Sequence, residues 1–170
     1  MKHAVIVSGG NINTDFALDF LKKNTDENTL LIAADRGLEF FERTGLVPDI
    51  AVGDFDSLSE SGKKFLETLS NTEIIRLRPE KDDSDTQSAA CLAMDRGMKR
   101  IMILGATGNR VDHLMANFGL LVLGRERGCE IILADPWNYM KLIESGTVLK
   151  RSEQFGKYVS FFSIGGDVPG

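Results

Sequence analysis

The alternation of short apolar runs with helical segments is the feature that most constrains the fold of this chain. The apolar runs predict buried strands over residues 4–7, 30–34, 50–52, 73–77, 101–104 and 130–134. The segments between them predict helices over residues 14–23, 38–43, 59–69, 85–96 and 112–125. Buried strands that alternate with helices favour an α/β fold, with a Rossmann-like, mostly parallel sheet and helices on both faces.

The character of the sequence changes after Pro136. Three segments then predict successive strands, separated by turn residues and without helices: 138–144, 146–151 and 156–163. We therefore expect residues 1–136 to form the α/β domain and residues 137–170 to begin a smaller all-β domain. Because roughly thirty residues are too few for an independent core, we expect this second domain to continue beyond Gly170.

Composition excludes several classes of protein. Of 170 residues, 42% are hydrophobic and 26% charged, which is typical of a soluble globular protein. The net charge of −5 argues against a nucleic-acid binder, which would need a basic face. No run approaches the ~18 apolar residues of a membrane span. Cys91 and Cys129 fall in apolar patterns and form no zinc-type cluster, so we expect buried thiols in a cytoplasmic protein.

Two carboxylates directly follow the predicted strand 50–52. If this segment is extended, Asp54 and Asp56 project to the same side, because side chains at i and i+2 point the same way. Two negative charges at such a short distance repel each other unless a cation lies between them. Mg²⁺ is the cation that prefers carboxylate and phosphate oxygens. The alternative is a polar turn that caps the next helix through Asp56, Ser57 or Ser59.

Other polar residues and glycines also follow the predicted strands. In open parallel sheets, ligands bind outside the carboxyl ends of the strands. The residues at these ends are Ser8, Gly9, Gly10, Asn11, Asp35, Arg36, Gly37, Arg76, Arg78, Lys81, Asp82, Asp85, Gly105, Gly108, Arg110, Asp112, His113, Asp135 and Asn138. Acids, basic groups and exposed backbone amides at one edge suit a metal-bound polyphosphate.

Several of these groups also have a structural reading. Asp85 suits a helix N-terminus, and Asp82 suits a solvated loop. The turn at Gly105 lacks the three-glycine fingerprint of dinucleotide-binding folds, which makes it a weak sign of a nicotinamide cofactor. His113 and Asn117 lie four residues apart on one helical face, and this polar pair in an apolar helix predicts a surface that faces a cleft.

Taken together, the motifs resemble those of the thiamine pyrophosphokinase (thiamine diphosphokinase) family. The segments that carry the resemblance in order and spacing are 33–37, 53–57, 81–85 and 105–113, with Asn117. The resemblance covers about residues 4–140. It implies transfer of a pyrophosphoryl group from ATP to the hydroxyl of thiamine, giving thiamine diphosphate and AMP. It also implies a homodimer in which the β-rich domain supplies part of the thiamine site.

The resemblance further implies a metal site and a phosphate site. Asp54, Asp56 and one or both of Asp82 and Asp85 would hold Mg²⁺, directly or through water. Lys81 and Arg110 would hold phosphate oxygens, while Asp112 would orient Arg110 or act near the thiamine hydroxyl; the sequence identifies no general base.

A nucleotide pocket follows from the same resemblance. Its expected lining is Gly9, Gly10, Asp35, Gly37, Gly105, Gly108, His113 and Asn117. Trp137 is a candidate wall for the thiamine rings, and equally a candidate core residue.

Three other functions remain open at the level of the sequence. A dehydrogenase or reductase could use the Gly105 turn, but it would leave the carboxylate clusters unexplained. A non-catalytic nucleotide-binding module would bind ATP without releasing AMP. Another Mg²⁺-dependent phosphotransferase could use the same sheet with a different acceptor, because a fold alone does not fix the substrate.

Overall fold

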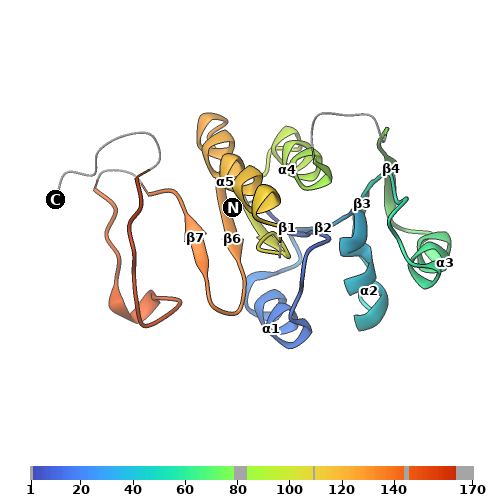
Figure 1. Ribbon diagram of the computed structural model, residues 1–170, viewed down its shortest axis with the longest axis horizontal. Coiled ribbons are helices and arrows are strands. Elements are labelled where there is room, and N and C mark those ends of the chain that lie inside the picture. The colour runs from blue at the N-terminus through green and yellow to red at the C-terminus, as the bar shows by residue number, and fades with distance from the viewer. Residues whose placement is uncertain (1, 79–83, 109, 144–145, 164–170) are drawn as a thin grey trace.

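A single twisted sheet organises the molecule in the computed structural model, which describes residues 2–78, 84–108, 110–143 and 146–163 (Figure 1). Its strand order is β4-β3-β2-β1-β5-β6-β7. The strands are β1 (His3–Val7), β2 (Thr29–Ala34), β3 (Ile50–Gly53), β4 (Glu73–Arg76), β5 (Arg100–Leu104), β6 (Glu130–Ala134) and β7 (Tyr139–Lys141). Strands β1 to β6 are parallel, and β7 is antiparallel to β6.

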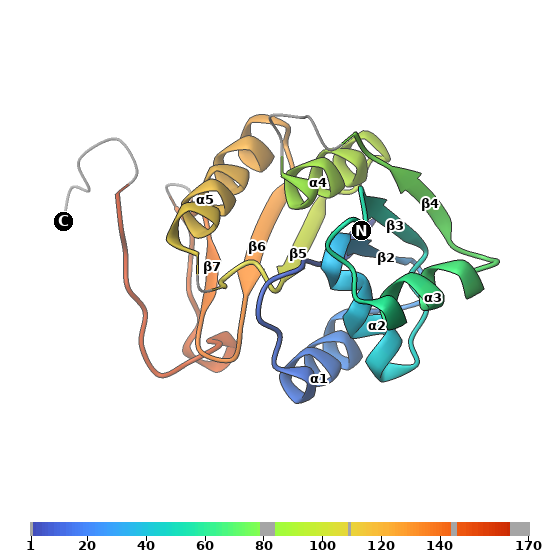
Figure 2. The ribbon, with the colours of Figure 1, turned by 45° about the vertical axis from the view of Figure 1, so that its right-hand side comes forward.

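Helices cover both faces of this sheet (Figures 1 and 2). One face carries α1 (Thr14–Asn24), α2 (Leu38–Thr44) and α3 (Glu60–Thr68), and the other carries α4 (Asp85–Asp95) and α5 (Val111–Glu126). Two short 3₁₀ turns complete the elements, η1 (Asp35–Gly37) and η2 (Arg151–Glu153). The predicted α/β class, with its mostly parallel sheet and two helical layers, is confirmed.

The alternation of side chains along each strand divides the core into two layers. On β1, Ile6 belongs to the cluster under α4 and α5, whereas Val5 and Val7 belong to the cluster under α1, α2 and α3. All three side chains are fully buried, which explains why this strand is continuously apolar from Ala4 to Val7. Phe40 and Phe41 on α2 are also fully buried, and each contributes about 1.5–3 kcal/mol through the burial of its ring.

Local sequence signals place the helix ends. Ser84 caps α4 by accepting a hydrogen bond from the Gln87 amide at 3.2 Å. Gly45 ends α2 with a left-handed φ of 70°. Of the three candidate caps for α3, Ser59 is the one used, and it accepts from the Gly62 amide at 3.2 Å.

The region after Pro136 differs from the prediction. The strand expected over residues 138–144 is present only as β7, which joins the α/β sheet by pairing with β6. The strands expected over 146–151 and 156–163 are wrong, because neither segment has strand structure and residues 151–153 form η2. A strand needs a neighbouring edge to accept its backbone hydrogen bonds, and these segments have none among the described residues. The domain boundary near residue 137 remains a prediction.

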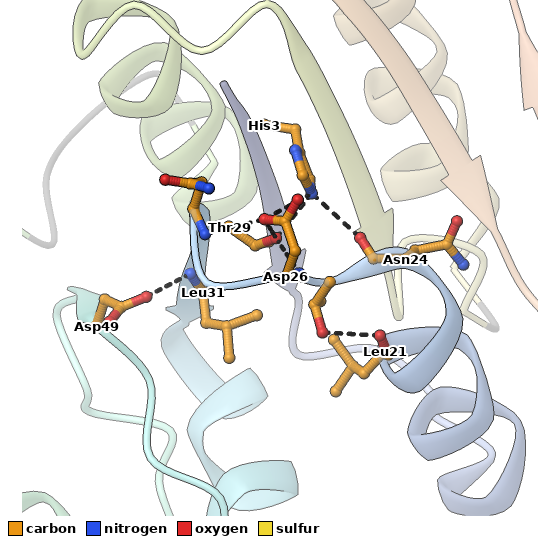
Figure 3. Close-up of polar contacts among 9 residues, drawn as sticks. His3, Leu21, Asn24, Asp26, Thr29, Leu31 and Asp49 are labelled. Carbon is orange, nitrogen blue, oxygen red and sulfur yellow. Dashed lines mark hydrogen bonds and ion pairs between the residues drawn. The ribbon is translucent and has the colours of Figure 1, made fainter. Parts of the chain in front are cut away.

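A network of polar contacts lies at the end of the sheet where the parallel strands begin, which we call the amino-terminal edge (Figure 3). The opposite end, where these strands finish, is called the carboxyl-terminal edge. His3 Nε2 lies 2.7 Å from Thr29 Oγ1 and 3.2 Å from the Asn24 carbonyl oxygen. The Asp26 carboxylate accepts from the Asn28 amide at 2.9 Å and from the Thr29 hydroxyl at 3.1 Å, and these bonds lower the pKa of Asp26. The network joins the end of α1 to β1 and β2.

Neither cysteine forms a disulfide bond. Cys129 is buried as predicted, whereas Cys91 is only half-buried. Within the described ranges, no helix has the length and apolar character needed to cross a membrane.

Candidate functional site

The predicted site residues gather at the carboxyl ends of the parallel strands. The sheet order places the reversal of strand connection between β1 and β5, which is where ligands bind in open α/β sheets. Two glycine-bearing turns meet there, since the Gly10 amide donates to the Gly105 carbonyl at 3.1 Å. A Cβ on Gly10 would lie 2.2 Å from that same oxygen, so the approach requires glycine.

Close backbone contact also explains the neighbouring glycines. A Cβ on Gly37 would lie 1.9 Å from the Val7 carbonyl oxygen. The Cα atoms at Gly10 and Gly108 face each other across the two turns, with 3.6 Å from a Cβ on Gly108 to Gly10 Cα. The predicted glycines therefore come together at one place, and Gly10 and Gly37 are required there for packing, whatever they contribute to a ligand.

Asp54 and Asp56 lie together, but not for the predicted reason. Strand β3 ends at Gly53, and Phe55 then adopts a left-handed φ of 62°, so the segment is a tight turn and the expected extended geometry is wrong. The Asp56 amide donates to Asp54 Oδ1 at 3.1 Å. The proximity of Asp54 raises the pKa of Asp56 through their hydrogen bond and their charges.

Asp35 lies beside Asp54 and Asp56 and forms an acid cluster with them and with Asp85. The family resemblance had placed Asp35 in the nucleotide pocket instead. Asp35 follows β2 with a left-handed φ of 45°. Its Oδ2 accepts from the Ser57 hydroxyl at 2.6 Å, while its Oδ1 is buried and has no partner among the described residues. Burial raises the pKa of Asp35 despite the Ser57 bond, and the charges of Asp85 and Asp54 raise it further.

Asp85 is held over the same edge by the start of α4. The neighbouring Thr86 hydroxyl lies 2.6 Å from the Ser8 hydroxyl, and both side chains are buried. This contact fixes the first turn of α4 to the end of β1. The two other predicted members of the cluster and phosphate site, Lys81 and Asp82, lie outside the described residues.

The donor set of the cluster suits a hard divalent cation. Asp35, Asp54, Asp56 and Asp85 offer carboxylate oxygens, the ligands that Mg²⁺ prefers. Among the described side chains, no three acids, histidines or cysteines are already gathered at metal-binding distance. Mg²⁺ usually keeps several waters and takes one or two carboxylates plus substrate phosphates, so it does not require such a closed cage.

Arg110 and Asp112 form an exposed pair at the start of α5. Arg110 Nε donates to Asp112 Oδ1 at 3.1 Å, and a second bond joins Arg110 Nη2 to Asp112 Oδ2 at 2.5 Å. This pairing lowers the pKa of Asp112 and raises that of Arg110. A fork-to-fork pair fixes the plane of the guanidinium, as expected of a residue that orients Arg110.

Asn117 departs from the predicted cleft-facing pair. It is buried, with 6% of its surface exposed, and its Nδ2 donates to the Ala106 carbonyl at 2.8 Å. His113 is exposed in the first turn of α5. Asn117 therefore supports the Gly105 turn from beneath, and the two side chains do not line one surface.

A pocket of ≈ 660 Å³ adjoins the glycine turns at the ends of β1, β5 and β6. Its lining is Asn11, Ile12, Asn13, Thr107, Leu114, Phe118, Asp135, Pro136, Trp137, Asn138 and Met140. Trp137 is 81% exposed, so it is a wall residue and not a core residue. The apolar residues on α5 that line this pocket were not predicted, because their helical spacing is the same as that of core residues.

Hydrogen bonds keep the polar side of this pocket in place. Burial alone would raise the pKa of Asp135, but hydrogen bonds from Thr107, Asn138 and the Trp137 amide bring it below its ordinary value. Asp135 Oδ1 accepts from the Trp137 and Asn138 amides at 2.8 and 2.7 Å. Asp135 thus holds the turn that carries Trp137.

Comparison with known proteins identifies the family. Residues 21–133 match the family model "Thiamin pyrophosphokinase, catalytic domain", which is more than half of the chain. The chain belongs to the thiamine pyrophosphokinase family. The resemblance inferred from the motifs is therefore confirmed, and membership in this enzyme family sets aside the reductase alternative.

Individual relatives agree with this assignment. The curated thiamine pyrophosphokinase of Bacillus subtilis (strain 168) is 32% identical over 168 residues, which cover 99% of this chain and 77% of that protein. The crystal structure of thiamine pyrophosphokinase from B. subtilis matches with a TM-score of 0.71 and 33% identity, over 82% of this chain and 64% of that one. The structure from Geobacillus thermodenitrificans matches with a TM-score of 0.68 and 29% identity, over 82% and 62%. The matched part is thus less than two thirds of these solved relatives.

Proposed function

We propose that this chain transfers the pyrophosphoryl group of ATP to the hydroxyl oxygen of thiamine in the presence of Mg²⁺. The thiamine oxygen bonds to the β-phosphorus, the bond from that phosphorus to the oxygen bridging to the α-phosphorus breaks, and AMP leaves with that oxygen. The hydroxyl proton is released. The products are thiamine diphosphate and AMP.

One observation carries the proposal beyond family membership. Asp35 is half-buried with a raised pKa, and one of its oxygens has no partner among the described residues; it lies in the electrostatic range of Asp54, Asp56 and Asp85. A cluster that repels itself in this way is stabilised by a cation and is typical of a functional site. It lies at the edge where the glycine turns meet, as a metal-bound triphosphate requires.

The chain's own residues would act by positioning and by neutralising charge, on which phosphoryl transfer mainly depends. Asp54, Asp56 and Asp85, with Asp82, would hold Mg²⁺, which when bound neutralises charge on the phosphate oxygens. Arg110 would bind a phosphate oxygen in the orientation set by Asp112, and its pairing geometry supports that role. Lys81 is the second proposed phosphate ligand.

The pocket beside the glycine turns would hold an aromatic ring of one of the two substrates. Its apolar walls and exposed Trp137 suit a flat heterocycle, and amide side chains at its rim offer hydrogen bonds. Gly9, Gly105, Gly108 and His113 remain proposed contacts of the nucleotide.

The proposal extends to assembly and location. Large apolar side chains of the region after Pro136 are exposed, among them Val148, Tyr158 and Phe162 at 81–91%. Such a surface supports a homodimer in which residues from 137 onward contribute to the thiamine site. The absence of a disulfide bond between Cys91 and Cys129 supports a cytoplasmic location.

Nucleotide analysis tests the proposal. The protein is incubated with ATP, Mg²⁺ and thiamine, and with each left out in turn. AMP and thiamine diphosphate that form together, and only when thiamine is present, are the expected result. ADP instead of AMP would indicate another phosphotransferase. Absence of products from this chain and from one extended past Gly170 would overturn the proposal.

A further inference from the structure

Two loops at the acid cluster share a backbone conformation that needs support. Asp35 follows β2 and Phe55 follows β3, and they are the two described residues other than glycine with positive φ. The loops touch, since a Cβ on Gly53 would lie 3.0 Å from Asp35 Cα. Such conformations are costly and persist where the surroundings hold them in place.

Two side-chain hydrogen bonds hold the loops together. The Ser57 hydroxyl donates to Asp35 Oδ2 at 2.6 Å. The Ser59 amide donates to Glu39 Oε1 at 2.9 Å, and Arg36 lies 3.6 Å from the other Glu39 oxygen. Both bonds run from the turn after β3, which carries Asp54 and Asp56, to the segment after β2, which carries Asp35. Together they form a two-point clamp between these two segments.

The Ser57 bond determines how the Asp35 carboxylate is turned. With Oδ2 held by Ser57, rotation of the carboxylate is restricted, and Oδ1 is left buried without a partner in the part of the chain that the structure describes. The Asp54 and Asp85 charges act on this carboxylate. Ser57 therefore fixes one oxygen so that the other is available within the cluster.

The opposite side of the turn is anchored separately. Phe55 is buried, with 4% of its surface exposed, and the Arg76 guanidinium lies 5.5 Å from its ring centroid. Ser57 itself is exposed. Removal of its hydroxyl should leave this anchor and the core intact, which separates an effect on the cluster from an effect on folding.

We propose that Ser57 and Glu39 are positioning residues that clamp the Asp54–Asp56 turn against Asp35 and so set the spacing of carboxylates for a divalent cation. The inference rests on the proposed function, which gives the divalent cation its role in the reaction. It concerns two residues, Ser57 and Glu39, that are not among the expected metal ligands. It predicts that the clamp controls cation affinity in the absence of substrates.

Binding of Mn²⁺ to the nucleotide-free protein, followed by electron paramagnetic resonance, tests the Ser57 half of the clamp. Ser57→Ala should raise the Kd for Mn²⁺ by about tenfold, as expected when one hydrogen bond to a charged group is lost. Ser57→Thr keeps a hydroxyl and should restore affinity. Thr68→Ala is the matched control, because it removes an exposed hydroxyl that donates to the Phe65 carbonyl at the other end of α3, away from the clamp.

Glu39 provides an independent arm. Glu39→Gln keeps an oxygen for the Ser59 amide and should bind Mn²⁺ nearly as the unmodified protein does, whereas Glu39→Ala should bind it several-fold more weakly. In turnover assays, Ser57→Ala and Glu39→Ala should raise the Mg²⁺ concentration for half-maximal rate more than they lower kcat at saturating Mg²⁺.

The outcomes separate the two proposals. Unchanged Mn²⁺ affinity in Ser57→Ala, or no Mn²⁺ binding by the unmodified protein, would overturn the clamp. Loss of affinity that accompanies a lower melting temperature and is not restored by Ser57→Thr would also overturn it, because the contact would then be structural. Failure to form AMP in the unmodified protein contradicts the proposed function and not the clamp.

Discussion

The two edges of the sheet carry the same kinds of residue in opposite electrostatic states. At the amino-terminal edge, hydrogen bonds from Asn28 and Thr29 lower the pKa of Asp26. At the carboxyl-terminal edge, burial raises the pKa of Asp35 and a neighbouring acid raises that of Asp56. Asp26 has hydrogen-bond donors as partners, whereas Asp35 is buried and both Asp35 and Asp56 have acidic neighbours. The raised pKa values belong to this acid cluster and not to every carboxylate at that end of the sheet, because Asp112 and Asp135 have donors there and lowered pKa values.

This contrast indicates which edge contributes stability and which binds a ligand. A carboxylate with a lowered pKa is stabilised by the fold, whereas one with a raised pKa is held ionised at the expense of the fold. Backbone strain follows the same division, since Asp35 and Phe55 both lie at the carboxyl edge. The presence of acidic residues does not distinguish the two edges, because both have them. The partners of Asp26 on one side and of Asp35 and Asp56 on the other do distinguish them.

The largest expected effect is on catalysis at the carboxyl edge. Asp54→Asn should lower turnover by at least about 100-fold, because a proposed metal ligand loses its charge. Its melting temperature should stay nearly unchanged. Asp26→Asn at the other edge is the control and should keep full turnover. Steady-state AMP formation measures both, and a fully active Asp54→Asn would remove the basis for the metal assignment.

The next effect is on stability at the amino edge. Asp49 Oδ2 accepts from the Leu31 amide at 2.7 Å where β2 begins to pair with β3 (Figure 3). Asp49→Ala should lower the free energy of unfolding by about 1–2 kcal/mol, because the amide loses its acceptor. The melting temperature should then fall by about 2–8 °C. Urea denaturation checks the free energy.

Turnover in Asp49→Ala should match that of the unmodified protein at temperatures where both are folded. A loss of kcat without a loss of stability would mean that the amino edge takes part in catalysis. That result would break the division between the two edges.

Sequence alone predicted the parts of the molecule that depend on local pattern. The strands up to β6, the candidate cap Ser59 and the grouping of polar residues at the strand ends all follow from periodicity and capping chemistry. The strands expected over 146–151 and 156–163 failed because pairing depends on a distant edge. The site was predicted in its members but not in its geometry.

The missed geometry arises from contacts between segments far apart in the sequence. Phe55 is buried in its left-handed turn, and Ser57 reaches Asp35 because β2 and β3 are neighbours in the sheet. The sequence predicts a cleft at Asn117, because a polar residue in an apolar helix can either face a cleft or form a buried hydrogen bond. The helical pattern does not distinguish the two. In the fold Asn117 meets the Ala106 carbonyl.

The smallest expected effect concerns the pH dependence of stability, and it compares the edges directly. Asp35 has a folded pKa above its ordinary value of 3.8, so the folded protein holds this proton more tightly than the unfolded chain. Stability is therefore lost as pH rises from about 4 through the folded pKa of Asp35. The contribution of Asp26 to stability changes with pH in the opposite direction, because its folded pKa lies below 3.8. This contribution is present above about pH 4 and is lost as the pH falls through the folded pKa of Asp26.

Thermal unfolding from about pH 3 to pH 7, without divalent metal, measures both signs. Asparagine keeps an oxygen for Ser57 and tolerates the left-handed backbone, so Asp35→Asn removes little except the charge. Relative to the unmodified protein, it should gain stability as the pH rises, whereas Asp26→Asn should lose stability. If Mg²⁺ at millimolar concentration removes the gain in Asp35→Asn, the repulsion at the carboxyl edge is what the cation relieves. Parallel curves for the two variants would mean that the edges do not differ.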